Sequence, residues 1–422
     1  MNNSVSLGLS IIMARNKIFS QTRDPFPDHP ALSRGRVDGP FTALNPTQAQ
    51  YEHLPTNEKA LSEADVPAEK SRQHGIGHKW SSRNNRKGRH TLTLSQSAVD
   101  DPNLKTPRPT SHPAEIAKGI WRMLVRYPFY DVSFDVAYIF TWGSIVWVIN
   151  AFFALLPYTN PTLTFAGEVL DGGGITAFIG ATIFEVGSVL LMLEAVNENR
   201  SGCFGWAVEE LLDEHDTKNS LHIRPDACIH HHKNRKNLVG SSADEGVQAI
   251  KDQTRPEIDG TPSGARSWVW WPSSHELRTH YLHDIGFLAC SAQMFGATIF
   301  WISGFTALPG IYNNMSPGLT DGIYWVPQVI GGSGFVVSGT LFMIETQKHW
   351  WQPAFGVLGW WIGLWNLIGG IGFTLCPCFG FSSAHWAQEQ AAVSTFWGSW
   401  AFLIGSVIQW YESLEKYPVE KL

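Results

Sequence analysis

Six stretches of this chain are long and apolar enough to cross a lipid bilayer, and they constrain its fold more than any other feature. A helix of about 20 residues spans a hydrocarbon core of about 30 Å, and each stretch reaches that length without a single Lys, Arg or His. The bilayer core supplies no water for an open strand edge, which favours helices. We therefore predict an all-α membrane protein with six transmembrane helices, at residues 134–157, 174–196, 285–308, 323–345, 354–375 and 393–411.

The distribution of basic residues predicts the orientation of these helices. All 31 Lys and Arg residues lie before the first stretch or in connections on the same side of the membrane, and the opposite connections, 158–173, 309–322 and 376–392, contain none. Lys and Arg are retained on the cytoplasmic side of short loops. Both termini are therefore predicted to be cytoplasmic. The acidic residues of the opposite connections are Glu168, Asp171, Asp321 and Glu389.

The remaining segments are predicted to lie in the cytoplasm or at the membrane surface. Residues 1–112 are rich in polar residues and contain no apolar run that could offset chain entropy by burial, so we expect a disordered tail. Residues 113–133 place Ile116, Ile120 and Leu124 on one face, which is typical of an interfacial amphipathic helix. Residues 197–284 are expected to form a cytoplasmic loop with short interfacial helices, and residues 412–422 a cytoplasmic C-terminus.

A pattern of small residues repeats along the even-numbered spans. It runs Gly-x3-Phe, then two small residues at positions 7 and 8, then Glu, and it starts at Gly180, Gly331 and Gly398. A degenerate version starts at Gly143, Gly296 and Gly359 in the odd-numbered spans. We therefore predict three repeated helical hairpins, 134–196, 285–345 and 346–411, whose small residues allow close helix packing. The packing residues are Gly180, Gly187, Ser188, Gly331, Ser338, Gly339, Gly398, Gly405 and Ser406.

The segments 178–194 (FIGATIFEVGSVLLMLE) and 396–412 (FWGSWAFLIGSVIQWYE) resemble the helices of the YrhK-like family of small membrane domains. Residues 134–412 as a whole are similar to multi-pass membrane proteins of fungi that are built from such units. This resemblance implies a fold and no activity.

The repeated glutamates have two interpretations. Glu194, Glu345 and Glu412 fall at the cytoplasmic ends of their spans, where they could form a ring that gathers cations. The alternative is that they mark where the helices meet water, paired with Lys348 or Lys416. We favour the second, because interfacial carboxylates cost little free energy.

Glu185 is the one ionisable residue near the middle of a span. A carboxylate at that depth must be neutral or have a partner within the bundle. One interpretation is a proton or cation site; the other is a protonated side chain that donates a single interhelical hydrogen bond. Both remain open. The polar side chains that would assist such a site are Asn150, Gln293, Gln328 and Asn366.

Cysteine and histidine clusters give no complete site. Cys228 and His230–His232, with His222 nearby, suit zinc or copper by residue type, but their spacing matches no closed template and favours a solvated loop. Cys376 and Cys378 are interpreted as packed thiols, with a labile disulfide as the alternative. No metal or other cofactor is predicted.

A basic cluster, Arg83, Arg86, Lys87 and Arg89, is interpreted as a solvated run, with a regulated lipid or kinase site as the alternative.

Two functions fit these features. The first is a non-catalytic membrane protein that organises or senses, with the lipid bilayer as its environment and cytoplasmic protein partners bound through the N-terminal tail. The second is a small-solute or proton-linked transporter or channel that uses Glu185. An enzyme is the least favoured class, because it would need clustered carboxylates or histidines at one leaflet and only the cytoplasmic edge could supply them. The sequence also has no Walker loop and no G-x-S-x-G motif, the commonest signatures of coupled pumps and serine hydrolases. The basic residues are accounted for as topology signals, so no nucleic-acid partner is predicted.

Overall fold

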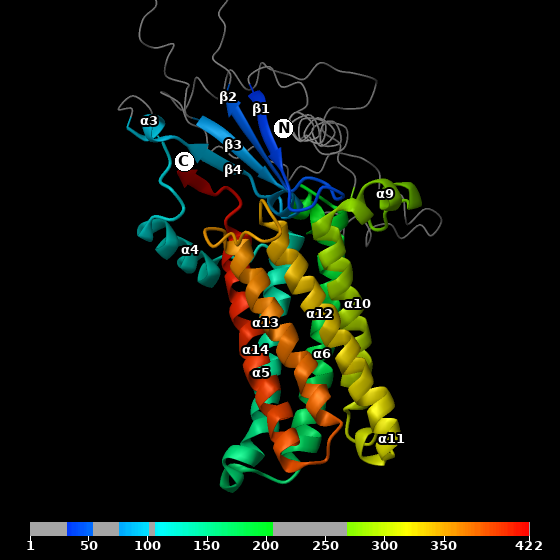
Figure 1. Cartoon of the computed structure of the whole chain (residues 1–422). Helices are drawn as coiled ribbons and strands as arrows, with labels where there is room; N and C mark the ends of the chain where they lie inside the picture. Colours follow the sequence, from blue (N-terminus) through cyan, green and yellow to red (C-terminus); the bar gives the residue numbers. More distant parts are fainter. Residues whose placement is uncertain (1–31, 54–75, 101–105, 206–267, 422) are drawn as a thin grey trace, which may run out of the picture. The chain divides into compact units, whose positions relative to one another are not determined.

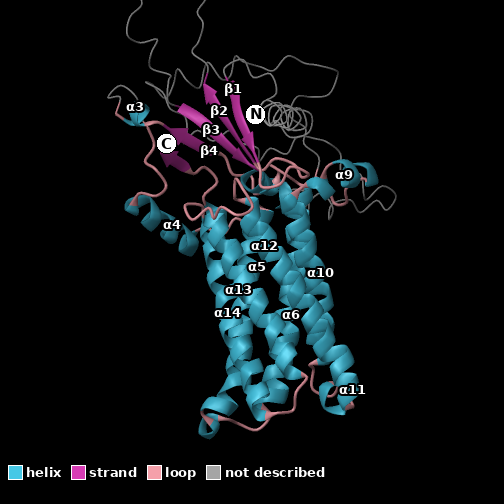
Figure 2. Cartoon of the chain, in the orientation of Figure 1, coloured by secondary structure: helices cyan, strands magenta, loops and turns pink. Residues whose placement is uncertain are grey.

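The computed structural model describes residues 32–53, 76–100, 106–205 and 268–421, which form two compact units. One unit combines the described residues up to Arg126 with Asn197–Trp270 and Leu414–Leu422, and the other consists of Tyr127–Val196 and Trp271–Ser413. Figure 2 shows the strands, which belong to the first unit, and the long helices, which belong to the second.

The second unit is a helical bundle. Its long helices are α5 (Val132–Thr159), α6 (Gly174–Val196), α10 (Ile285–Thr306), α12 (Val326–Glu345), α13 (Leu358–Gly380) and α14 (His385–Leu414). Two of them begin with π-helical turns: η3 (Glu168–Gly173) runs into α6, and α11 (Pro317–Thr320) with η8 (Asp321–Trp325) runs into α12. A buried aspartate caps the N-terminus of two other long helices. The Asp131 side chain accepts a hydrogen bond from the backbone of α5, and the Asp284 side chain accepts one from the backbone of α10.

The six helices pack against one another in chain order and so form a ring: α5 on α6, α6 on α10, α10 on α12 and α12 on α13, and α13 on α14 where Gly372 lies against Gly398. Figure 1 shows these long helices from the side. Trp301 of α10 donates a hydrogen bond to Thr182 of α6 (3.0 Å). The ring closes between the first and last helices, where the hydroxyls of Ser144 and Ser406 are 3.3 Å apart and the rings of Tyr138 and Trp410 meet at 5.3 Å. We call the end where α5 joins α6, α10 joins α12 and α13 joins α14 the distal end.

These helices confirm the predicted fold class. Six helices in the described part of the chain are long and apolar enough to span a membrane, and all six overlap the predicted stretches. The protein is therefore a multi-pass membrane protein with an α-helical membrane domain. The order of the helices is compatible with three successive hairpins.

The first unit contains a five-stranded sheet in the order β1–β5. Strands β1 (Leu32–Asp38), β2 (Gln48–His53), β3 (Ile76–Ser81) and β4 (Thr91–Leu94) pair antiparallel in succession. The last strand, β5 (Val419–Lys421), comes from the C-terminus and pairs parallel to β4. Two small apolar clusters form its core: Val37, Ala49, Tyr51 and Trp80, and Leu92, Leu94 and Val419.

This sheet corrects the extent given to the predicted disordered tail, residues 1–112. Residues 32–53 and 76–100 form strands with short helices, and residues 1–31, 54–75 and 101–105 lie outside the described residues. The basic cluster is likewise not a solvated run. Its residues lie on or just after α2 (Ser82–Arg86), and Arg83, Arg86, Lys87 and Arg89 are all buried. Thr91 and Thr93 are buried in β4, which argues against a kinase site there.

The C-terminal residues also hold the N-terminal strands together. His90 and Leu92 donate backbone hydrogen bonds to the carbonyls of Lys416 and Pro418, and the Arg89 side chain donates one to the carbonyl of Glu415. Lys79 and Glu420 form an ion pair at 2.8 Å. Chain segments more than 300 residues apart are thus part of one fold.

We expect deletion of residues 416–422 to unfold the sheet of the first unit. The deletion removes Val419 and exposes Leu92 and Leu94, which are 2% and 0% exposed, a loss of about 3–5 kcal/mol. Limited proteolysis of the N-terminal region should become much faster. Glu420→Gln is the control, because a half-exposed ion pair contributes about 1 kcal/mol at most. Equal protease resistance of the deleted and full-length chains would contradict this role of the C-terminus.

The interfacial helix also has a structural counterpart. Helix α4 (Pro113–Val125) leaves Ile120, Trp121 and Leu124 more than half exposed (54%, 63% and 63%). Glu115 accepts a hydrogen bond from Lys118, which lowers the pKa of the Glu115 carboxyl and keeps it ionised on the polar face. The apolar face suits a lipid surface, and the interfacial position of α4 stays a prediction.

Candidate functional site

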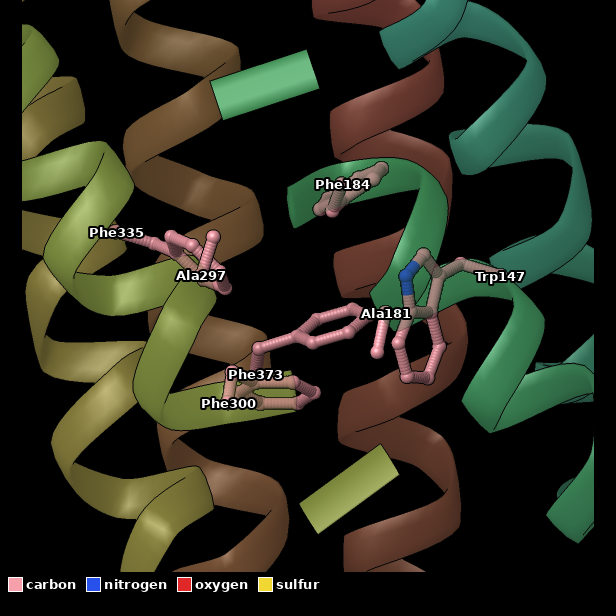
Figure 3. Close-up of a pocket in the computed structure, with 7 residues that line it drawn as sticks. All are labelled: Trp147, Ala181, Phe184, Ala297, Phe300, Phe335 and Phe373. Atoms are coloured by element: carbon pink, nitrogen blue, oxygen red, sulfur yellow. The ribbon is translucent and has the colours of Figure 1, made fainter. Parts of the chain in front are cut away.

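Six aromatic rings, one from each long helix, fill the centre of the bundle. Phe184, at 3% exposure, contacts Trp147 and Phe402, and Phe335 contacts Phe300, with ring centroids 5.6–6.5 Å apart. Figure 3 shows five of these rings converging with Ala181 and Ala297. Edge-to-face pairs at such distances are favourable beyond simple burial. We call the following set the aromatic cluster: Trp147, Phe184, Phe300, Phe335, Phe373 and Phe402.

Each ring of the aromatic cluster follows a glycine by four residues, and that glycine lies against the other helix of one of the pairs α5–α6, α10–α12 and α13–α14. A Cβ atom on Gly143 would lie 2.7 Å from the ring of Phe184, and one on Gly180 would lie 2.9 Å from Trp147. The other two helix pairs have the same reciprocal contacts, between Gly296 and Phe335, Gly331 and Phe300, Gly369 and Phe402, and Gly398 and Phe373.

In helix α13, the fifth of the long helices, the repeat is aligned on other residues than the sequence predicts. The sequence pattern predicts that Gly359 and Gly363 take the repeat positions, but the ring at the level of the cluster is Phe373, four residues after Gly369. Gly363 lies elsewhere along the helix, where its Cβ position is 2.6 Å from the backbone of Met343. The helix-packing interpretation of the small residues otherwise agrees with the close approaches at Gly180, Gly331, Gly339 and Gly398.

A cavity of about 320 Å³ lies on the distal side of the aromatic cluster. All six long helices contribute to its lining, and Trp147, Phe300 and Phe373 belong to both the lining and the cluster. Both π-helical turns contribute as well, η3 through Gly173 and η8 through Tyr324. Single π-turns are frequent at functional sites because they displace the helix backbone locally. The polar lining residues are Asn150, Tyr158, Ser303, Tyr312, Tyr324, Gln328, Cys376, Gln388 and Thr395.

Hydrogen bonds hold several of these polar groups in place. The Asn150 amide donates to the carbonyl of Gly173 at 2.7 Å and to the hydroxyl of Thr176 at 3.0 Å. Gln388 donates to the carbonyl of Ser382. Burial, and secondly the nearby Tyr158, raise the pKa of Tyr312, so its hydroxyl is neutral at physiological pH. Among the described residues, the lining contains no Asp, Glu, His, Lys or Arg.

The structure separates the five polar residues of the predicted intramembrane site, Glu185 and the four residues that the sequence groups with it. Asn150 and Gln328 line the cavity, whereas Glu185, Gln293 and Asn366 are not among the described residues that form its lining. Glu185 lies on the seam between α6 and α10, half-buried, and accepts a hydrogen bond from Thr298 at 2.9 Å. Its other oxygen, Oε2, is buried and has no hydrogen-bond partner within the part of the chain that the structure describes.

The repeated glutamates are buried, whereas the favoured interpretation places their side chains where the helices meet water. Glu194, Glu345 and Glu412 are 0%, 1% and 1% exposed, so their side chains do not meet water at the helix ends. A fully buried carboxylate is compatible with the bundle only where it is neutral or well paired.

The cysteine and histidine clusters fall into two groups. Cys228, His222 and His230–His232 lie outside the described residues. Cys376 and Cys378 are free thiols, and Cys376 lines the cavity. In the described ranges, no group of three or more His, Cys, Asp or Glu residues is arranged to hold a metal ion.

Sequence reasoning missed the aromatic character of this site. Tyr158, Tyr312 and Tyr324 were not singled out, although all three lie at or beside the predicted distal connections. The Gly-x3-Phe spacing predicts close helix packing and does not by itself indicate a cavity lined by aromatic rings. Comparison with known proteins adds no further guide: no protein-family model, no curated protein and no solved structure matches the chain.

Proposed function

We propose that this chain is a non-catalytic membrane sensor that binds a small organic molecule in the distal cavity. The observation that carries the proposal is a cavity of about 320 Å³ lined by all six helices and bounded on one side by the aromatic cluster. Ligand sites of about 300–1,000 Å³ typically combine an apolar lining with a few fixed polar groups. Asn150, Gln328 and Thr395 are such groups here.

The aromatic cluster supports binding over conduction. Its rings are 2–5% exposed and occupy the bundle axis, so an open aqueous path would require several of them to move together. The lining also lacks, among the described residues, the carboxylates and imidazoles that usually serve as general acids and bases. Both features favour a receptor that holds its ligand unchanged.

The output of such a sensor would be a change in its cytoplasmic partners. We propose that both termini are cytoplasmic and that partner proteins bind through the N-terminal region. Deletion of residues 1–31 leaves all five strands of the sheet intact, so a loss of partners in a pull-down would identify that segment as the binding element. Unchanged partners would remove this part of the proposal.

The proposed binding is tested with the full chain in lipid nanodiscs and a panel of small organic molecules, both neutral and charged. A ligand at 100 times its Kd stabilises the folded state by about 2.7 kcal/mol, which raises the unfolding temperature measurably. Ala391→Phe should abolish the shift, because Ala391 is 5% exposed and lines the cavity. Val337→Phe is the matched control, since Val337 is 50% exposed on the outside of α12. A panel without any shift, or a shift that survives Ala391→Phe, would contradict the proposal.

A proton-linked transporter is the second candidate, supported by the unpartnered oxygen of Glu185. It is tested by proton flux in proteoliposomes that contain the wild type or Glu185→Gln. Flux that depends on Glu185 would favour the transporter, and equal flux in the two proteins would remove it.

A further inference from the structure

Seven of the residues that line the distal cavity carry aromatic rings. Three rings of the aromatic cluster form one side, and four more stand nearer the distal end: Tyr158, Tyr312, Tyr324 and Trp325. Tyr324 contacts Tyr312 and Trp325 edge to face, at centroid distances of 4.9 and 4.5 Å. The face of an aromatic ring carries negative electrostatic potential, so several rings around one space can attract a cation.

The charges around the distal end have the matching sign. The three distal connections, 158–173, 309–322 and 376–392, contain no Lys or Arg, and their acidic residues are Glu168, Asp171, Asp321 and Glu389. Glu389 lies next to the lining residue Gln388 and interacts electrostatically with Tyr158. One histidine, His385, packs against the Tyr158 ring at 5.5 Å. Carboxylates near such a space raise the local concentration of cations.

From these two observations we infer that the cavity ligand is a compact organic cation of the quaternary ammonium type. The inference rests on the proposed sensor function and names its ligand class. A small inorganic cation is disfavoured, because Ca²⁺ and Mg²⁺ require several oxygen ligands and the described lining has no carboxylate. A methylated ammonium has no tightly held hydration shell to lose, and it gains about 0.5–2 kcal/mol from each well-placed ring.

The inference is tested with two probes of the same shape. Choline and 3,3-dimethylbutan-1-ol differ only in a charged nitrogen that replaces a neutral carbon. Calorimetric titration of the full chain in nanodiscs should give a choline Kd at least about tenfold below that of the neutral alcohol. Choline that binds no more tightly than the alcohol would overturn the ligand class. The sensor function itself fails if the whole panel of neutral and charged molecules produces no shift, or if the shift survives Ala391→Phe, so the two failures are distinguishable.

A pair of variants locates the effect in the rings. Tyr312→Leu removes a ring of the lining, whereas Tyr312→Phe keeps the ring and removes only its hydroxyl. Choline affinity should fall about tenfold in Tyr312→Leu and change little in Tyr312→Phe, and binding of the neutral alcohol should be similar in both. Equal choline affinity in the two variants would contradict recognition through aromatic faces. Equal unfolding temperatures without ligand establish that both variants fold.

Discussion

Gly339→Val is expected to separate two helices of the bundle and to destabilise it more than any surface change. A Cβ atom at Gly339 would lie 2.5 Å from the backbone nitrogen of Leu367 and 2.8 Å from its Cα. Backbone atoms of a packed helix cannot yield as the end of a flexible side chain can. Overpacking typically costs about 1–3 kcal/mol and occasionally more, and we expect the upper end of that range. The measurement is the unfolding temperature in detergent or nanodiscs.

The control for this prediction is another glycine of the same membrane domain. Gly322 has no heavy atom within 4 Å of its Cβ position, so Gly322→Val should leave the unfolding temperature nearly unchanged. Three more glycines on the α12–α13 interface, Gly332, Gly363 and Gly370, approach backbone atoms at 2.6–2.9 Å and should behave like Gly339. Similar stability of Gly339→Val and Gly322→Val would show that the two helices do not pack as closely as described.

Phe184→Ala is expected to have the second large effect, a loss of about 3–5 kcal/mol. Phe184 is 3% exposed and its ring contacts those of Phe140, Trp147, Phe335 and Phe402. Lipid chains are as apolar as the protein interior, so the loss arises from missing van der Waals contacts and from the cavity left behind. The change is read from thermal unfolding of the membrane domain.

Phe295→Ala provides the comparison for Phe184→Ala. Phe295 is 57% exposed on α10, so its truncation removes the same atoms without leaving an internal cavity. We expect Phe295→Ala to alter stability by less than about 1 kcal/mol. If Phe184→Ala were as mild as Phe295→Ala, the aromatic cluster would not be the packed centre of the bundle.

The membrane domain was predictable because the bilayer limits what a chain can form. Every long apolar stretch had to be a helix, and α10 (Ile285–Thr306) starts at the predicted residue. The ends were less predictable where a helix continues beyond the apolar core. Helix α14 begins at His385, eight residues before the predicted start, because the polar residues Gln388 and Glu389 extend its first turns. Hydropathy detects the residues that suit lipid, whereas backbone hydrogen bonding continues past them.

The sheet of the first unit was not predictable from local patterns. Its strands have only three to seven residues, and long polar segments separate some of them. Leu92 and Leu94 are buried partly by Val419, which lies more than 300 residues further along the chain. Because each of these distant segments supplies only a few apolar residues to the core, neither contains an apolar run that could be recognised in the sequence.

The candidate site was predictable only in part. Asn150 and Gln328 were identified because polar residues inside spans are costly and therefore conspicuous, and both line the cavity. Glu185 was conspicuous for the same reason, but a single sequence does not show which face of a helix points inward. Its position beside Thr298, away from the cavity lining, became apparent only from the packing of α6 against α10.

The most direct test of this account is the sidedness of two cysteines in sealed membrane vesicles. A variant with Cys228 as its single cysteine is compared with a variant in which all native cysteines are replaced and Ser383, exposed in the distal connection, becomes cysteine. Three of the six long helices that the structure describes, α10, α12 and α13, lie between the two positions along the chain. A membrane-impermeant thiol reagent should therefore label one variant from outside and the other only after the vesicles are opened. Labelling of both from the same side would contradict the six-span arrangement.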